Sequence, residues 1–138
     1  MNEIVTKCPA KINLNLRILD KREDGYHNIQ TDYQLIDIYD HLKFKSNKDR
    51  NITIESKETY LNDEFNTIYQ SAEKLQKLMN ENTGVVIEVK KNIPTGSGLG
   101  GASSNAASTL VALNKLWRLN LNKHALIKIA SSLSLIHI

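Results

Sequence analysis

Residues 94–104 read Pro94-Thr95-Gly96-Ser97-Gly98-Leu99-Gly100-Gly101-Ala102-Ser103-Ser104, a glycine-rich stretch between two segments of different periodicity. Alternating apolar residues before it predict a strand, and an alanine-rich segment after it predicts a helix. Glycines let the backbone approach a ligand closely. The start of a helix leaves unpaired N–H groups with a partial positive charge, which is a geometry that binds phosphate. We therefore interpret the whole stretch as a phosphate-binding loop.

The stretch departs from two established phosphate-binding patterns. It is not a Walker A loop, because no Gly-Lys-Ser/Thr follows the glycines. It does not match the dinucleotide fingerprint, because several strands precede it and no βαβ unit with a ribose-binding acid is evident. The serine hydroxyls add donors, and one of them would also assist a magnesium ion. A flexible surface loop before a capped helix is the simpler alternative.

Outward from this loop, the chain alternates between strand and helix patterns. Period-two patterns predict strands at residues 11–18, 29–38, 42–44, 52–54 and 85–89. Helical patterns predict helices at residues 67–80, 103–117 and 123–133, the first capped by Asn66 and the last by Asn122. The first two helices are expected to supply core contacts from Ile68, Ala72, Leu75 and Met79, and from Ala107, Leu110, Val111 and Trp117. This order of elements predicts an α+β fold in one domain.

The first strand carries polar side chains that are candidates for chemistry. Lys11, Asn13 and Asn15 share one face, because alternate residues of a strand point the same way. A lysine there would neutralise a transferring phosphoryl group or lower the pKa of a nearby hydroxyl; a plain solvent-exposed face is the alternative. Tyr26 and His27 follow a turn signal, where they would stack on a flat ring and hydrogen-bond to its edge, or pack on their own domain.

Composition and charge narrow the class of protein. With 138 residues, 41% hydrophobic and 24% charged, the chain is not fully disordered. No apolar run reaches the ~18 residues of a membrane span, and the first residues lack the apolar core of a secretory signal. We therefore expect a cytoplasmic protein with no membrane partner. The single cysteine, Cys8, has no partner for an internal disulfide.

The net charge of +3 is spread along the chain and suits an anionic substrate such as a nucleotide. Its densest basic stretch, Lys43, Lys45 and Lys48, is flanked by Asp40 and Asp49. That pattern predicts a charged, solvated edge strand. We expect no nucleic-acid partner, because no stripe of aromatic and basic side chains accompanies these lysines. The oligomeric state stays open.

Three segments together resemble the GHMP kinases, which include the galacto-, homoserine, mevalonate and phosphomevalonate kinases. The segments are Cys8-Pro9-Ala10-Lys11-Ile12-Asn13-Leu14, then Asp24-Gly25-Tyr26-His27 with Gln30-Thr31, and then the loop from Pro94 to Asn105. The glycine loop alone is typical of the whole family. The first two segments are similar to those of the members that act on 4-diphosphocytidyl-2-C-methyl-D-erythritol. The resemblance extends from about residue 6 to about residue 133.

The resemblance implies a fold, a reaction and a set of site residues. The fold is the GHMP N-terminal domain, which is ribosomal protein S5 domain 2-like, partnered by a C-terminal domain. The reaction is Mg²⁺-dependent transfer of the ATP γ-phosphoryl group to a hydroxyl of this small-molecule substrate, a step of the non-mevalonate route to isoprenoid precursors. Residues 94–104 would hold the ATP phosphates, and Lys11 would be catalytic. Asn13 would lie beside the methylerythritol portion, and Tyr26 and His27 would recognise the cytosine.

The end of the sequence departs from the family pattern. In the family, the helix matching residues 123–133 leads into Gly-Ala-Asp-Val-Pro, whose Asp is the catalytic base. Here no Asp or Glu follows Glu88. We expect residues 1–133 to be the N-terminal ATP-binding domain and residues 134–138 a non-native tail, with the C-terminal domain missing and the chain inactive by itself. The alternatives are a GHMP kinase of the homoserine or mevalonate type, and a non-catalytic nucleotide- or RNA-binding α+β module.

Overall fold

A mixed sheet covered on one face by helices forms the part of the chain that the computed structural model describes, residues 2–21, 23, 27–57, 63–79, 81–94 and 101–133. At residues 13–21, 27–33 and 63–66 it describes the backbone alone. The elements in chain order are β1 (Glu3–Lys21), β2 (His27–Asn47), β3 (Ile52–Ser56), α1 (Asp63–Gln76), β4 (Gly84–Lys90), α2 (Gly101–Leu116) and α3 (Lys123–Ser132). The predicted α+β class is confirmed.

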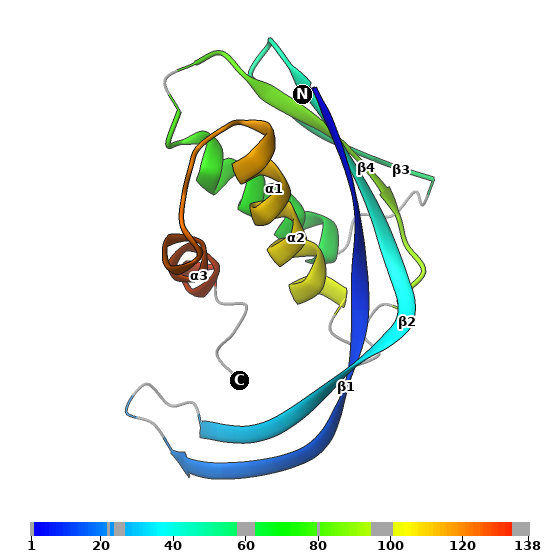
Figure 1. Cartoon of the computed structure of the whole chain (residues 1–138), viewed down its shortest axis with the longest axis vertical. Helices are drawn as coiled ribbons and strands as arrows, with labels where there is room; N and C mark the ends of the chain where they lie inside the picture. The colour runs from blue at the N-terminus through cyan, green and yellow to red at the C-terminus, as the bar shows by residue number, and fades with distance from the viewer. Residues whose placement is uncertain are drawn as a thin grey trace.

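The sheet has the strand order β1-β2-β4-β3. β1 pairs with β2 and β2 pairs with β4 in antiparallel fashion, whereas β3 and β4 run parallel. α1 and α2 lie side by side against one face, and α3 packs on α2 from outside (Figure 1). Within the described residues, no helix is long and apolar enough to cross a membrane.

β1 and β2 form a long hairpin that bends away from the rest of the sheet (Figure 1). β2 pairs with β4 only from His41 to Asn47, so the earlier part of β2 has β1 as its partner alone. The register between β1 and β2 shifts at Pro9/Ala10, Asn13/Asn15 and Ile18/Lys21. Such bulges bend a strand and increase its twist, and proline favours them because it has no N–H for the ladder. The two strands predicted at residues 29–38 and 42–44 both lie within β2 and are one continuous strand.

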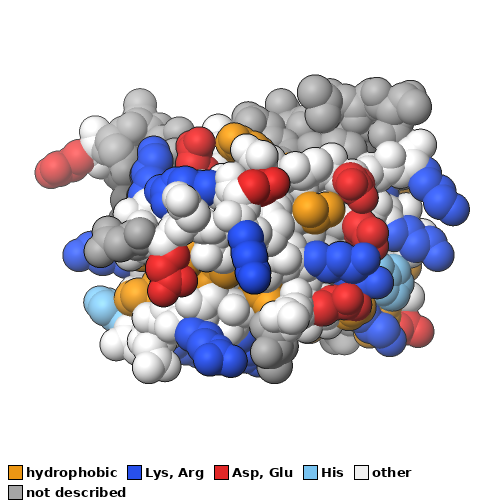
Figure 2. Space-filling model, turned by 90° about the horizontal axis from the view of Figure 1, so that it is seen from above, with side chains coloured by type: hydrophobic (Ala, Val, Ile, Leu, Met, Phe, Trp, Pro, Cys, Tyr) orange, Lys and Arg blue, Asp and Glu red, His pale blue; other side chains and the backbone are white. Residues whose placement is uncertain are grey.

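Alternation of side chains separates the covered face of the sheet from the open one. Leu42 and Phe44 of β2 are fully buried beneath the helices, as are Val85 and Ile87 of β4. The residues between them face the other way: Lys43 pairs with Glu3 at 3.2 Å, and Lys45 reaches Glu88 at 4.0 Å. Acidic and basic side chains are interspersed on the surface seen in Figure 2. The prediction of an edge strand here is wrong, because β2 lies between β1 and β4.

The predicted core positions of the first two helices are only partly correct. Ile68, Ala72 and Leu75 of α1 are fully buried, and Met79 packs partly buried against the core. α1 begins at Asp63, so Asn66 lies inside the helix and is not its cap. In α2, Leu110 is buried and Trp117 follows it into the core, but Ala107 and Val111 are exposed. The buried residues of α2 instead include Ala106, Thr109 and Leu113.

Two further features differ from what the sequence suggested. Ile12, one of the alternating apolar residues of the first predicted strand, is 41% exposed. β3, α1 and β4 form a βαβ crossover, which the sequence did not reveal because β3 has only 5 residues. The glycine-rich stretch follows β4 and lies outside this crossover. In the dinucleotide-binding fold, the glycine-rich loop lies directly before the crossover helix. The stretch here does not precede α1, so its departure from that pattern is confirmed.

Candidate functional site

The glycine-rich stretch connects the end of β4 to the start of α2, as its flanking periodicities predicted. Of the predicted phosphate-binding residues, the structure describes Pro94 and those from Gly101 to Ser104, while residues 95–100 lie outside the described part of the chain. α2 has no acidic residue in its first turn. Its positive end is therefore not neutralised by the helix's own side chains and is suited to an anion.

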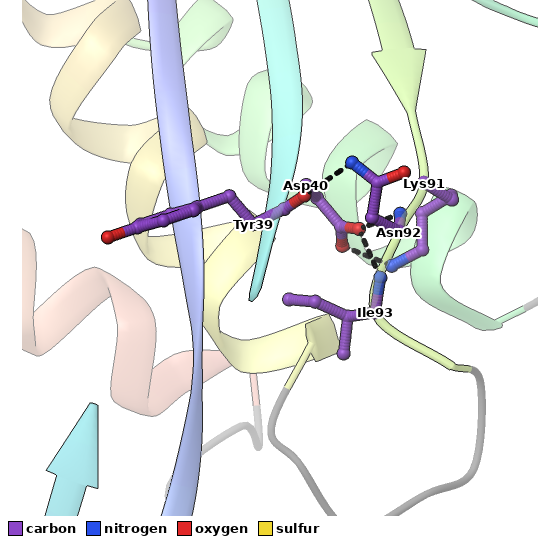
Figure 3. A network of polar contacts seen from close by, with 5 residues as sticks. All are labelled: Tyr39, Asp40, Lys91, Asn92 and Ile93. Atoms are coloured by element: carbon purple, nitrogen blue, oxygen red, sulfur yellow. Dashed lines mark hydrogen bonds and ion pairs between the residues drawn. The ribbon is translucent and has the colours of Figure 1, made fainter. Parts of the chain in front are cut away.

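A carboxylate fixes the chain just before this loop. Asp40 of β2 is fully buried, and its Oδ1 accepts hydrogen bonds from the backbone N–H groups of Asn92 at 2.7 Å and of Ile93 at 2.9 Å. Its Oδ2 pairs with the ammonium of Lys91, whose side chain is 5% exposed. The Asn92 side chain adds a hydrogen bond to the Tyr39 carbonyl at 2.8 Å. Figure 3 shows these side chains converging from β2 and from the segment that follows β4.

Sequence reasoning missed Asp40, which it placed beside a solvated basic stretch. Asp40 lies at the same strand parity as Leu42 and Phe44, so it belongs to the face that the helices cover. A carboxylate on the apolar face of a strand is rarely buried unless it is paired and hydrogen-bonded. The place of Asp40 on the apolar face of its strand was therefore the feature of the sequence that could have revealed it. Its partner, Lys91, gave no comparable signal because lysines are common at the ends of strands.

Cys8 lies near this network, on the covered face of β1. Its thiol is buried, and that burial raises its pKa above the usual value. A hydrogen bond with Ser108 of α2 acts in the opposite direction; the negative charge of Asp40 raises the pKa further and the positive charge of Lys91 lowers it. The thiol is therefore protonated at neutral pH and is not a nucleophile. Its role is to pack β1 against α2.

An unsatisfied amide is buried one residue after the predicted loop. Asn105 of α2 is fully buried, and within the part of the chain that the structure describes neither its Oδ1 nor its Nδ2 has a hydrogen-bond partner. Leaving a buried polar group unpaired costs about 1–3 kcal/mol. Native proteins usually complete such groups with an ordered water or a ligand. Asn105 was not among the predicted site residues, although it ends the motif Ser103-Ser104-Asn105.

The other predicted site residues belong to the β1–β2 hairpin. Lys11 is half-buried in β1, opposite Leu35 of β2, and directly follows the buried Ala10. The backbone of Asn13 pairs with Tyr33, and that of His27 pairs with Lys21. The side chains of Asn13 and His27, and the whole of Tyr26, lie outside the described residues. The catalytic role of Lys11 and the substrate-binding roles of Asn13, Tyr26 and His27 remain predictions.

Magnesium was predicted together with ATP. Within the described residues, no three His, Cys, Asp or Glu side chains gather as a metal cluster. Ser103 and Ser104 offer hydroxyl oxygens at the start of α2. This donor set fits Mg²⁺ that is held chiefly by substrate phosphates and water, as in many phosphoryl-transfer sites, and does not form a dedicated protein cage.

Comparison with known proteins decides the family. A family model described as the GHMP kinases N terminal domain matches residues 66–137. This chain belongs to the GHMP kinases. A crystal structure of 4-(cytidine 5'-diphospho)-2C-methyl-D-erythritol kinase superposes with a TM-score of 0.77 at 32% identity, over 94% of this chain and 46% of that one. A homoserine kinase from Cytophaga hutchinsonii superposes at 0.68 and 18% identity, over 99% and 42%, and shows the shared GHMP fold.

Sequence relatives within the GHMP family are more specific. The 4-diphosphocytidyl-2-C-methyl-D-erythritol kinase of Prochlorococcus marinus strain MIT 9215 is 47% identical over 132 residues. That alignment covers 95% of this chain and 42% of the relative, so the chain spans less than half the length of the protein it matches. The resemblance drawn from the three sequence motifs is thereby confirmed, as is the fold of the GHMP N-terminal domain.

Proposed function

We propose that the protein carrying this chain transfers the γ-phosphoryl group of ATP to a hydroxyl of 4-diphosphocytidyl-2-C-methyl-D-erythritol. The observation that carries the proposal is 47% identity, over 95% of the chain, to an enzyme named for that substrate. The homoserine kinase of the same fold shares only 18%. The reaction would act in the non-mevalonate route to isoprenoid precursors, in the cytoplasm, on a small molecule and without a nucleic-acid partner.

The proposed phosphate site is the loop from residue 94 to residue 104. Phosphoryl transfer depends mainly on positioning and on charge stabilisation. Backbone N–H groups of the loop and of the start of α2 would hold the ATP phosphates, and the hydroxyls of Ser103 and Ser104 would add donors. Mg²⁺ bound to the phosphates would supply further neutralisation of their charge. The amide of Asn105, which is buried and has no hydrogen-bond partner among the described residues, supports a ligand at this end of α2.

The proposed acceptor side of the site is the β1–β2 hairpin. The acceptor hydroxyl oxygen would form the new bond to the γ-phosphorus and release its proton to a general base, while the bond from that phosphorus to the bridging oxygen would break and ADP would leave. The ammonium of Lys11 would stabilise the negative charge on the transferring group. Asn13 would hydrogen-bond to the methylerythritol portion, and Tyr26 and His27 would stack on and hydrogen-bond to the cytosine.

A substrate panel tests the proposal. The longest product that the gene encodes is purified, and ADP release is measured with 4-diphosphocytidyl-2-C-methyl-D-erythritol, homoserine and mevalonate. We expect turnover with the first substrate and at least about 100-fold lower kcat/KM with the others, because a site built to hydrogen-bond a substrate discriminates strongly against molecules that lack its groups. Preferred turnover of homoserine or mevalonate would instead assign one of the other GHMP activities.

The non-catalytic alternative is tested by binding. If the chain were an RNA-binding module, labelled RNA would be retained on a filter at concentrations where ATP is not. We expect the reverse, because acidic and basic side chains are interspersed on the surface seen in Figure 2. Lys43 and Lys45 also form ion pairs with Glu3 and Glu88. A field of mixed sign gives little of the phosphate attraction that dominates nucleic-acid binding.

A further inference from the structure

The strand ladder ends just before the loop begins. β2 and β4 are paired from Asn47 opposite Gly84 to His41 opposite Lys90, and the pairing goes no further. Beyond this point β2 follows β1 into the bent hairpin (Figure 1). The segment 91–93 therefore leaves the sheet at the place where the chain turns toward the phosphate loop.

Where the hydrogen bonds between β2 and β4 end, the side chain of Asp40 binds the backbone of the departing segment instead. Its carboxylate accepts from two successive backbone N–H groups, those of Asn92 and Ile93, and pairs with the Lys91 ammonium (Figure 3). Both charged side chains are almost completely shielded from water. Hydrogen bonds to a shielded carboxylate are short and strong compared with neutral ones. The orientation of the backbone entering Pro94 is thus set by one side chain of β2.

We propose that Asp40 is a positioning residue for the phosphate-binding loop. The far end of the loop is fixed by α2, where Gly101, Asn105 and Ala106 are buried, and Asp40 fixes the near end. Fixed positions for the segment 91–93 and for the start of α2 would lower the ordering cost of binding a phosphate between them. This inference rests on the proposed function, and it concerns the affinity for ATP and not the recognition of the alcohol.

The test compares two substitutions at Asp40 with a control in the core, in the longest product that the gene encodes. Asp40→Ala removes every contact of the carboxylate. Asp40→Asn keeps an oxygen that accepts from Asn92 and Ile93 but loses the charge that pairs with Lys91. Leu75→Ala is the control, because Leu75 is fully buried in α1 and truncating it weakens the fold without touching this network. The readouts are kcat, the KM for each substrate and amide hydrogen exchange over residues 91–105.

Positioning predicts a selective change. Asp40→Ala should raise the KM for ATP on the order of 100-fold, the effect of an ~1 Å misplacement, while the KM for the alcohol stays unchanged. Asp40→Asn should raise the KM for ATP about 3- to 10-fold, since uncharged hydrogen bonds are weaker. Both should speed exchange across residues 91–105. Leu75→Ala should lower the melting temperature, leave both KM values unchanged and speed exchange no more over residues 91–105 than over the rest of the core.

The outcomes separate this inference from the function it rests on. If Asp40→Ala does not fold, Asp40→Asn decides alone: an unchanged KM for ATP with unchanged exchange overturns the inference and makes Asp40 a purely stabilising residue. Absence of ADP release in the unsubstituted protein would overturn the proposed function instead. In that case the hydrogen-exchange comparison still supports or overturns the positioning of the segment by Asp40.

Discussion

At the scale of single residues, Cys8 links burial to pH dependence. Burial raises the pKa of its thiol, so the folded chain holds this proton more tightly than the unfolded chain does. The resulting stabilisation is fully present below the unfolded pKa of about 8.5, and it is lost as the pH rises through the folded pKa. We expect the stability of the chain to fall more steeply above pH 8.5 than that of Cys8→Ala.

Two measurements check this expectation. Urea unfolding of both proteins from pH 7 to pH 10 gives the difference in slope, with Cys8→Ala as the reference for every other titrating group. Thiol labelling at pH 8 should be slow in the folded chain and fast in urea, because the thiolate is the reactive form and burial suppresses it. Equal labelling rates in the two states would show that the thiol is accessible and contradict the assignment.

Gly84 is a position where a side chain has no room. A Cβ placed there would lie 2.6 Å from the backbone N of Asn51 and from Oδ1 of Asn47. The neighbouring Val85 N–H donates to the Asn51 carbonyl at 2.9 Å, so that backbone is already engaged. We expect Gly84→Ala to destabilise the chain by roughly 1–3 kcal/mol through overpacking.

Chemical denaturation measures this loss. The matched control is Thr53→Ala on the neighbouring strand β3, where the side chain is exposed. That exposed substitution should change the free energy of unfolding by no more than about 0.5 kcal/mol. If Gly84→Ala behaves like the control, the start of β4 accommodates a methyl group and the close approach is not a constraint.

At the scale of elements, α3 depends on the residue that caps its start, Asn122. Asn122 is extended and accepts the Ala125 N–H at 2.8 Å through its side chain, as the sequence predicted for a cap. No residue of α3 is fully buried, so packing contributes less than in the other helices. We expect Asn122→Ala to cost about 1 kcal/mol, seen as faster amide exchange over residues 123–132. Asn122→Asp keeps the acceptor and should leave that exchange slow; equal exchange in both variants would contradict the cap.

The same scale shows which elements the sequence could predict. β4 was predictable because Val85, Ile87 and Val89 alternate within a central strand that is buried on one face. α2 was located correctly, but its buried face was not, since Ala106 and Thr109 are buried and Val111, an expected core contact, is exposed. Small buried residues carry little hydrophobic signal, so the sequence does not reveal which face of such a helix packs.

The hairpin and the site show a second limit of sequence reasoning. Nothing in the local pattern indicates that residues 29–38 and 42–44 form one strand, because the bulges that bend it depend on pairing with β1. The glycine loop was recognised from its own residues and its place between a strand and a helix. Asp40 was not recognised, because its partners lie 51 to 53 positions away in the sequence.

At the scale of the whole molecule, chain length bears on catalysis. The 132 aligned residues cover 42% of a relative of the same family, and the given sequence contains no Asp or Glu after Glu88. The resemblance to the family implies a base in a Gly-Ala-Asp motif, and a chain without that base would lose about 10²- to 10⁴-fold in rate. We expect the purified 138-residue chain to release no ADP above a no-enzyme blank, whereas a gene product that continues past Leu133 into Gly-Ala-Asp turns over. Reading the gene from source DNA identifies which product exists, and robust turnover by the 138 residues alone would show that the base lies within them.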